Sequence, residues 1–167
     1  QDPDELSQKT GIPVVVVPGS DTTLDEKAYV TIRILGELYR LKSRAEELTA
    51  YLKAIQKDLD ERTSAIAEEA KPSCYVGGVA FKGQHGFEGT EAYYGPFELI
   101  HAKNLANTTE QTGAFNIDVE QVLSWDPDLI FLDFNGMSLI GEDYAAHPDF
   151  YNALTAVKGG KVYSQIS

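Results

Sequence analysis

The sequence predicts an α/β fold in which a Rossmann-like lobe with a parallel sheet follows one long helix. Three observations support this fold class. Wholly apolar runs, such as 12–17 and 129–132, are typical of strands buried on both faces, as in parallel sheets. Strand and helix patterns alternate from residue 71 onward, which indicates βαβ units. Between the two halves, apolar residues recur every three or four positions from Leu41 to Ala70.

Residues 1–40 predict a helix, a strand and a second helix. Asp2 can cap a first helix that begins with Pro3, and Gly11 ends it. The β-branched run that follows predicts a buried strand. After a turn, Thr22 or Thr23 can cap a second helix that extends to about residue 39.

The segment from Leu41 to Ala70 predicts a single helix of about 27 residues, which would be about 40 Å long. Charged residues occupy the face opposite its apolar stripe. The stripe consists of Leu41, Ala45, Leu48, Leu52, Ile55, Leu59 and Ile66. Such a helix is either a strut packed on globular lobes or a self-associating coiled coil. Ala45 and Thr63 are poor seam residues for a coiled coil, so the sequence favours the strut.

The second half begins where Pro72 breaks the helix, and Ser73–Val79 predict its first strand. Gly77 and Gly78 within this strand indicate the close approach of another backbone or of a ligand. The expected order after it is an irregular stretch at 81–95, a helix from 96 to about 102, a short strand at 113–117, a helix at 119–124 capped by Asp118, a strand at 129–132, a loop at 135–142, a helix at 148–154 and a strand at 161–164.

Composition excludes several classes of function. The formal net charge of −12 leaves no basic stripe for binding phosphates, so we expect no nucleic-acid partner. Cys74 is the only cysteine, which excludes an intrachain disulfide and a thiolate zinc site. The sequence has no phosphate-binding loop, no Gly-x-Ser-x-Gly elbow and no recognisable nucleophile–His–acid spacing. We therefore expect no enzyme activity, no catalytic residues and no resident cofactor.

Three stretches occur in the order found in a known family: 2–17 (DPDELSQKTGIPVVVV), 125–133 (WDPDLIFLD) and 154–163 (LTAVKGGKVY). With the long helix between the first and second, the chain resembles the periplasmic-binding-protein family of ABC importers for ferric siderophores, haem and cobalamin. This resemblance implies two α/β lobes joined by a long interlobe helix, with the ligand held between the lobes. Residues 1–40 would be the tail of the N-terminal lobe, 41–70 the linking helix and 71–167 the C-terminal α/β lobe.

The resemblance also implies the function. The chain would belong to the substrate-binding component of an ABC importer, located outside the cytoplasmic membrane in the periplasm or as a lipoprotein. It would capture an iron-type chelate, such as a ferric siderophore, haem or a cobalamin-like molecule, and deliver it to the membrane permease. Family members extend beyond both ends of this sequence, so we expect an internal fragment, whose exposed surface would favour self-association.

Two other classes of function remain open from the residues. One is an α/β enzyme half related to metal chelatases or nitrogenase-type cofactor domains, in which His85 would act as acid, base or metal ligand. The other is a helical interaction module that uses residues 41–70.

Two loops are the candidate ligand site, because ligands of open parallel sheets bind beyond the carboxyl ends of the strands. The first loop is 81–95 and the second is 133–138, and we expect them to lie side by side. The expected ligand-binding residues are His85, Glu91, Tyr93, Tyr94, Asn135 and Met137, with His85 also a possible direct metal ligand. The alternatives are a solvated first loop whose tyrosines pack on the core, and a second loop in which Asp133 or Asn135 only caps a helix.

Overall fold

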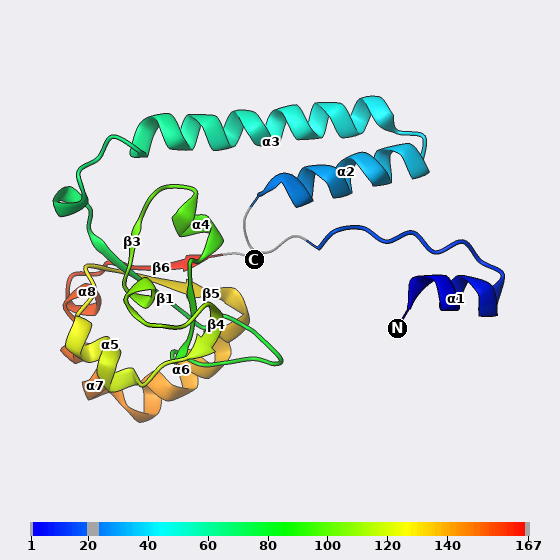
Figure 1. Ribbon diagram of the computed structural model, residues 1–167. Helices are drawn as coiled ribbons and strands as arrows, with labels where there is room; N and C mark the ends of the chain where they lie inside the picture. Colours follow the sequence, from blue (N-terminus) through cyan, green and yellow to red (C-terminus); the bar gives the residue numbers. More distant parts are fainter. Residues whose placement is uncertain (1, 20–23, 166–167) are drawn as a thin grey trace. The chain divides into compact units, whose positions relative to one another are not determined.

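The computed structural model describes residues 2–19 and 24–165 (Figure 1). The chain divides into two compact units, 1–58 and 59–167. The domain boundaries expected from the sequence, at residues 40 and 70, stay predictions. Among the described residues, no helix combines the length and the apolar character needed to cross a bilayer.

The first unit begins with α1 (Pro3–Thr10), as predicted. The Asp2 carboxylate accepts a hydrogen bond from the Asp4 N–H at 2.9 Å, and Gly11 ends the helix with a left-handed φ of 69°. The strand predicted at 12–17 is absent from the described structure, and Ile12 is 65% exposed. That prediction was wrong for this chain because a strand needs a neighbour for its backbone groups, and no described segment pairs with this one.

Two helices complete this unit, α2 (Glu26–Leu38) and α3 (Lys42–Thr63). Asp25 caps α2 by accepting from the Ala28 N–H at 3.1 Å, whereas the predicted caps, Thr22 and Thr23, lie outside the described residues. The α3 helix is shorter than the predicted 41–70. It ends where the apolar stripe is interrupted: the Thr63 hydroxyl donates to the Leu59 carbonyl at 2.7 Å. A short 3-10 turn follows at Glu68–Ala70.

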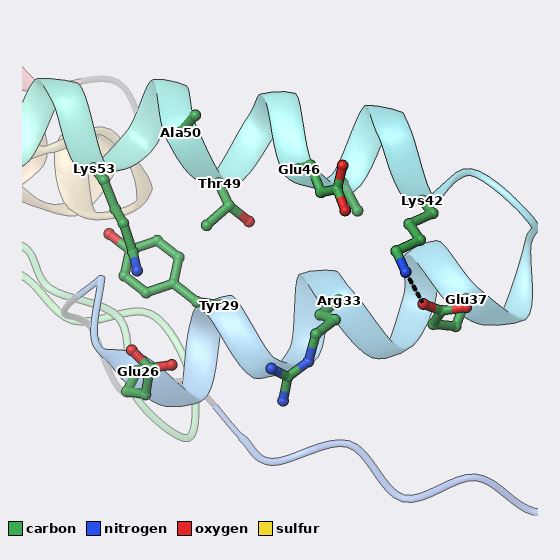
Figure 2. A pocket seen from close by; sticks show the side chains of 10 residues that line it. Glu26, Tyr29, Arg33, Glu37, Lys42, Glu46, Thr49, Ala50 and Lys53 are labelled. Atoms are coloured by element: carbon green, nitrogen blue, oxygen red, sulfur yellow. Dashed lines mark ion pairs between the residues drawn. The ribbon is translucent and has the colours of Figure 1, made fainter.

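The helices α2 and α3 form an antiparallel hairpin (Figure 1). A Cβ at Gly36 would lie 2.5 Å from the Cβ of Ala45, so the glycine allows close helix packing. The Tyr29 hydroxyl donates to the Gln56 side chain. The Lys53 amino group lies over the Tyr29 ring, 4.7 Å from its centre, and Figure 2 shows these two side chains between the helices. The stripe residue Ala45 thus has a partner helix within its own chain.

The second unit contains a four-stranded parallel sheet in the order β3-β1-β5-β6, which confirms the predicted fold class. Its strands are β1 (Ser73–Gly77), β3 (Lys103–Asn104), β5 (Leu129–Asp133) and β6 (Val162–Gln165). A separate antiparallel pair joins β2 (Gly89–Ala92) to β4 (Gly113–Asn116). The β2 strand was not predicted, because glycines and charged residues surround it in the stretch expected to be irregular.

The helices of this unit are α4 (Gly95–Glu98), α5 (Val119–Trp125), α6 (Met137–Ala146), α7 (Pro148–Ala153) and α8 (Thr155–Lys158). Short 3-10 turns lie at Leu105–Thr108 and Phe134–Gly136. The helix expected from 96 to 102 is shorter than predicted. The loop expected at 135–142 is largely α6, because Ile140 anchors that segment on the sheet and overrides the turn signals of its glycines.

Successive residues of the central strands point to opposite faces of the sheet, and each face is covered. Tyr75 and Ile130 pack with residues of α5 to α8, including Val122, Tyr151 and Leu154. Cys74 and Val76 point the other way and pack with Tyr94 and Phe97. Burial on both faces explains the apolar runs that predicted a parallel sheet.

The motif Trp125-Asp126-Pro127-Asp128 holds distant segments together. Asp126 accepts hydrogen bonds from the backbone N–H and the hydroxyl of Thr155, at 2.7 and 2.6 Å. Asp128 accepts from the backbone N–H and the hydroxyl of Ser73, at 2.8 and 2.7 Å. These hydrogen bonds lower the pKa of both carboxyl groups from the ordinary value. The motif therefore fixes the starts of β1 and α8 relative to β5.

We expect the second unit to lose stability in acid, in part through Asp128. A carboxyl whose pKa is lowered on folding stabilises the protein above its unfolded pKa of about 4, and this contribution disappears as the pH falls through the folded value. Asp128→Ala should lower the free energy of unfolding by about 1 kcal/mol at pH 7 and by less at pH 3. Urea denaturation at both values measures this, with the exposed Glu110→Ala as control. An equal loss at both pH values would contradict the role given to the charge.

Candidate functional site

The candidate site lies where the strands β1, β5 and β6 end, at Gly77, Asp133 and Gln165. The segment after β1 and the turn after β5 cross in direct backbone contact. A Cβ at Gly136 would lie 2.4 Å from the Gly78 Cα and 2.6 Å from the His85 carbonyl oxygen. The two loops therefore lie side by side, as the sequence predicted, and the close backbone approach expected at Gly78 is present.

His85 is held inside its own loop. Its ring stacks on Phe81 at a centroid distance of 4.0 Å, and its Nε2 lies 2.8 Å from the Phe81 carbonyl oxygen. The Nδ1 is 3.9 Å from Glu88 Oε1, and Glu88 also accepts from the Gly86 N–H at 3.1 Å. These contacts shape the loop, so His85 orders the backbone around it.

Tyr94 is 5% exposed, packs edge-on against Phe97 and accepts a hydrogen bond from the Gln165 amide. Asp133 is the register partner of Gln165 and belongs to the same end of the sheet. Burial raises the pKa of Tyr94, the hydrogen bond from Gln165 lowers it, and the charges of Asp133 and Glu91 raise it further. Tyr94, Gln165 and Asp133 thus form a polar cluster, called here the edge cluster, in which Tyr94 keeps its proton at neutral pH.

The neighbouring residues Glu91 and Tyr93 are placed very differently. Glu91 lies in β2 and is buried, and its carbonyl oxygen accepts from the Asn104 amide at 3.0 Å. Tyr93 is 51% exposed with a φ of 57°, a left-handed conformation that is unusual for a bulky residue. The Asn107 side chain holds this turn by accepting from the Tyr93 N–H at 2.6 Å. The turn directs one tyrosine toward solvent and the next, Tyr94, into the core.

Asn135 and Met137, the two ligand-binding residues predicted in the second loop, do not lie together in the structure. Asn135 is exposed and donates from both its backbone N–H and its side-chain amide to Asp133 Oδ1, at 2.8 and 2.9 Å. Met137 lines an apolar pocket of about 380 Å³ with Leu132 and Val162. Those two side chains pack with the α5–α8 layer, opposite the face that holds Tyr94. Met137 is therefore not part of the edge cluster.

Two residues of the edge cluster, Asp133 and Gln165, were absent from the predicted ligand set. Each is the last residue of a strand that extends one residue beyond its predicted end. Asp133 already belonged to the second predicted loop at this edge, and extending the last predicted strand by one position would have placed Gln165 there as well.

The part of the chain that the structure describes contains no preformed site for direct coordination of a metal ion. No three or more His, Cys, Asp or Glu side chains gather there in a group that could hold an ion. Both ring nitrogens of His85 face groups of its own loop, Phe81 and Glu88. The arrangement offers hydroxyl, amide and carboxylate groups for hydrogen bonding to an organic ligand or to the periphery of a chelate.

Comparisons with known proteins agree with this fold. The chain is 24% identical over 161 residues to YvrC, an uncharacterized ABC transporter substrate-binding lipoprotein of Bacillus subtilis (strain 168). That match covers 96% of this chain and 49% of the relative, so the chain spans about half the length of the curated relative it matches.

Solved structures show the same likeness. A periplasmic solute binding protein from Veillonella parvula DSM 2008 superposes with a TM-score of 0.71 at 20% identity, covering 96% of this chain and 47% of the other. An ABC-type Fe³⁺-hydroxamate transport protein from Saccharomonospora viridis DSM 43017 gives 0.65 at 23% identity, covering 96% and 56%.

The match to a protein family decides which family the chain belongs to. The model described as periplasmic binding protein matches residues 1–165, which is nearly the whole sequence. It includes the long helix, the parallel sheet and both loops of the candidate site. The chain belongs to the periplasmic binding protein family.

Proposed function

We propose that this chain is part of the substrate-binding component of an ABC importer, which captures an iron-type metal chelate outside the cytoplasmic membrane and delivers it to the permease. The observation that carries the proposal is the family match over residues 1–165. The relative YvrC, described as an ABC transporter substrate-binding lipoprotein, supports the transport role and the extracytoplasmic location.

The ligand class is the finer part of the proposal. Structures of similar fold are described as an Fe³⁺-hydroxamate transport protein, as MolA bound to molybdate and as a protein with Ni(II) bound. The edge cluster favours an intact chelate over a bare ion, because its hydroxyl, amide and carboxylate groups do not converge as a metal-binding group. Exposed aromatic side chains nearby in the sequence, Tyr93 and Phe134, supply apolar area suited to an organic shell.

Catalysis by the same residues has less support. The enzyme alternative depends on His85 as an acid, a base or a metal ligand, and its ring is engaged by Phe81 on its face and at Nε2. The family is one of transport binding proteins.

A titration of this chain with diamagnetic gallium(III) chelates tests the proposal. We expect the amide NMR signals of residues 78–94 and 133–137 to shift, with a dissociation constant of about 1 mM, since about four contacts of about 1 kcal/mol each give that affinity. Tyr94→Phe keeps the packing on Phe97 and removes the hydroxyl, so it should weaken binding several-fold.

The matched control is Tyr151→Phe, which removes a hydroxyl that donates to Asp143 in the α6–α7 region, on the other side of the sheet. It should leave the affinity unchanged. Shifts confined to other parts of the chain, or no shifts with hydroxamate, haem or corrinoid ligands at millimolar concentration, would refute the proposed function.

A further inference from the structure

Tyr93 has a backbone conformation that is rare for its residue type, with a φ of 57° in the left-handed region. The other non-glycine residues with a positive φ, among those that the structure describes, carry polar side chains: Arg40, Lys82, His101 and Asp126. A bulky ring at such a position is strained, because its Cβ crowds the neighbouring backbone. Strain of this kind persists where the surrounding structure enforces it, and it is concentrated at functional sites.

Two asparagines enforce this conformation. Asn107 Oδ1 accepts from the Tyr93 N–H at 2.6 Å, and the Asn107 amide donates to Glu98 at 3.3 Å. On the other side of the turn, the buried Asn104 amide donates to the Glu91 carbonyl oxygen at 3.0 Å. The backbone is therefore fixed before and after Tyr93, and so is the direction of its Cα–Cβ bond.

The ring presented in this way makes no specific contact within its own unit. Tyr93 is 51% exposed, and among the described residues its ring packs against no other aromatic ring and its hydroxyl makes no hydrogen bond. Glycine would adopt the same φ without strain. The tyrosine thus lowers stability without a compensating hydrogen bond or ring contact in this unit, which indicates that the ring is kept for a contact with another molecule.

The position of Tyr93 indicates which molecule. The next residue, Tyr94, belongs to the edge cluster through its hydrogen bond from Gln165. On the second loop, Phe134 follows the edge-cluster residue Asp133 and is 64% exposed. Each loop of the candidate site therefore carries one exposed aromatic ring directly beside a member of the polar cluster. Polar groups with an aromatic surface beside them suit a ligand that has both hydrogen-bonding groups and a flat unsaturated part.

We propose that Tyr93 is a specificity-determining residue, whose ring stacks on a flat unsaturated group of the ligand. The inference rests on the proposed function and adds a structural class to the ligand: a chelate with an aryl group or a conjugated ring is preferred over a wholly aliphatic chelate. The rigid turn contributes to this preference, because the backbone that presents the ring is already ordered before the ligand binds.

Two gallium(III) trihydroxamate complexes that differ at one terminal amide test this inference. The amide is acetylated in one complex and benzoylated in the other, so the metal shell and the net charge are the same. This chain should bind the benzoylated complex about fivefold more tightly, which corresponds to about 1 kcal/mol for one aromatic stacking contact. NMR titration gives both dissociation constants.

Three variants assign the preference to the ring. Tyr93→Gly should bind both complexes with the affinity that the wild type has for the acetylated one, whereas Tyr93→Phe keeps the ring and should keep the preference. Tyr144→Ala is the matched control. It removes another half-exposed tyrosine ring, in α6, which packs on Tyr151 in the layer on the other face of the sheet. The fivefold preference should survive in this control.

Thermal unfolding without ligand tests the strain separately. Tyr93→Ala removes the ring but keeps a Cβ in the left-handed conformation, whereas Tyr93→Gly relieves it. The glycine variant should therefore unfold at a temperature a few degrees above the alanine variant. A lower unfolding temperature for Tyr93→Gly than for Tyr93→Ala would show that the turn is not strained and would remove the basis of the inference.

The binding results separate the two proposals. If the wild type binds the acetylated and benzoylated complexes equally, the inference about Tyr93 is wrong and the proposed function stands. A preference that survives in Tyr93→Gly comes from general apolar contact or from another residue, and it also overturns the inference. If no chelate binds, both proposals fail.

Discussion

Replacing Gly136 by alanine should destabilise the second unit by about 3 kcal/mol, although the change adds one methyl group. The backbone at Gly136 has an ordinary φ of −92°, so the loss does not arise from conformational strain. It arises from space, because the new Cβ would lie 2.4 Å from the Gly78 Cα and 2.7 Å from the Gly78 carbonyl oxygen. Backbone atoms cannot rotate away, so the two loops must separate. Thermal or urea unfolding of the variant measures the effect.

Gly141→Ala is the matched control, five residues away in α6. A Cβ there would meet no atom within 4 Å, and alanine favours the helix by up to about 1 kcal/mol over glycine. The two substitutions should therefore change stability in opposite directions. If Gly136→Ala proved as well tolerated as Gly141→Ala, the crossing of the loops would be wrong.

Leu154→Ala should lower the free energy of unfolding by about 3 kcal/mol. Leu154 is fully buried between α7 and α8, in the cluster that contains Tyr75, Val122 and Ile130. Truncation removes buried contacts from the centre of this layer and leaves a cavity that the rigid sheet cannot fill. Chemical denaturation monitored by the intrinsic fluorescence of Trp125, which packs against the same cluster, reports the loss.

Leu139→Ala controls for the change of side chain. Leu139 lies in α6 and is 37% exposed, so its truncation should alter stability by less than about 1 kcal/mol. Comparable losses in the two variants would show that the α6–α8 layer does not pack as described.

The parallel sheet could be predicted from the sequence because a strand that is buried on both faces appears as a continuous run of apolar residues. The runs at 73–79 and 129–132 contain few polar residues, and Asp118 marks the start of α5 as a capping residue. The segment 12–17 is also a continuous apolar run, but no described segment pairs with it as a neighbouring strand. A local pattern indicates that a segment can be a strand and is silent on its partner.

The candidate site was predicted less completely than the sheet. Its two loops could be placed from strand order, and their adjacency followed from the topology. The roles of individual residues depend on pairs distant in sequence, such as Tyr94 and Gln165, whose separation of 71 positions leaves no local pattern. The same holds for Met137, where the start of α6 turns the side chain to the opposite face of the sheet.

The pairing of β1 with β5 has a consequence for synthesis on the ribosome. Ser73 and Asp128, which join the starts of these central strands, are separated by 55 residues. β1 (73–77) is synthesised before both of its sheet neighbours. Until β5 is made, the described partner available to it in the sheet is β3, which pairs with it at two residues. The nascent chain must therefore keep β1 from associating with other molecules until β5 has left the exit tunnel. Chaperone demand during translation should be concentrated in that interval.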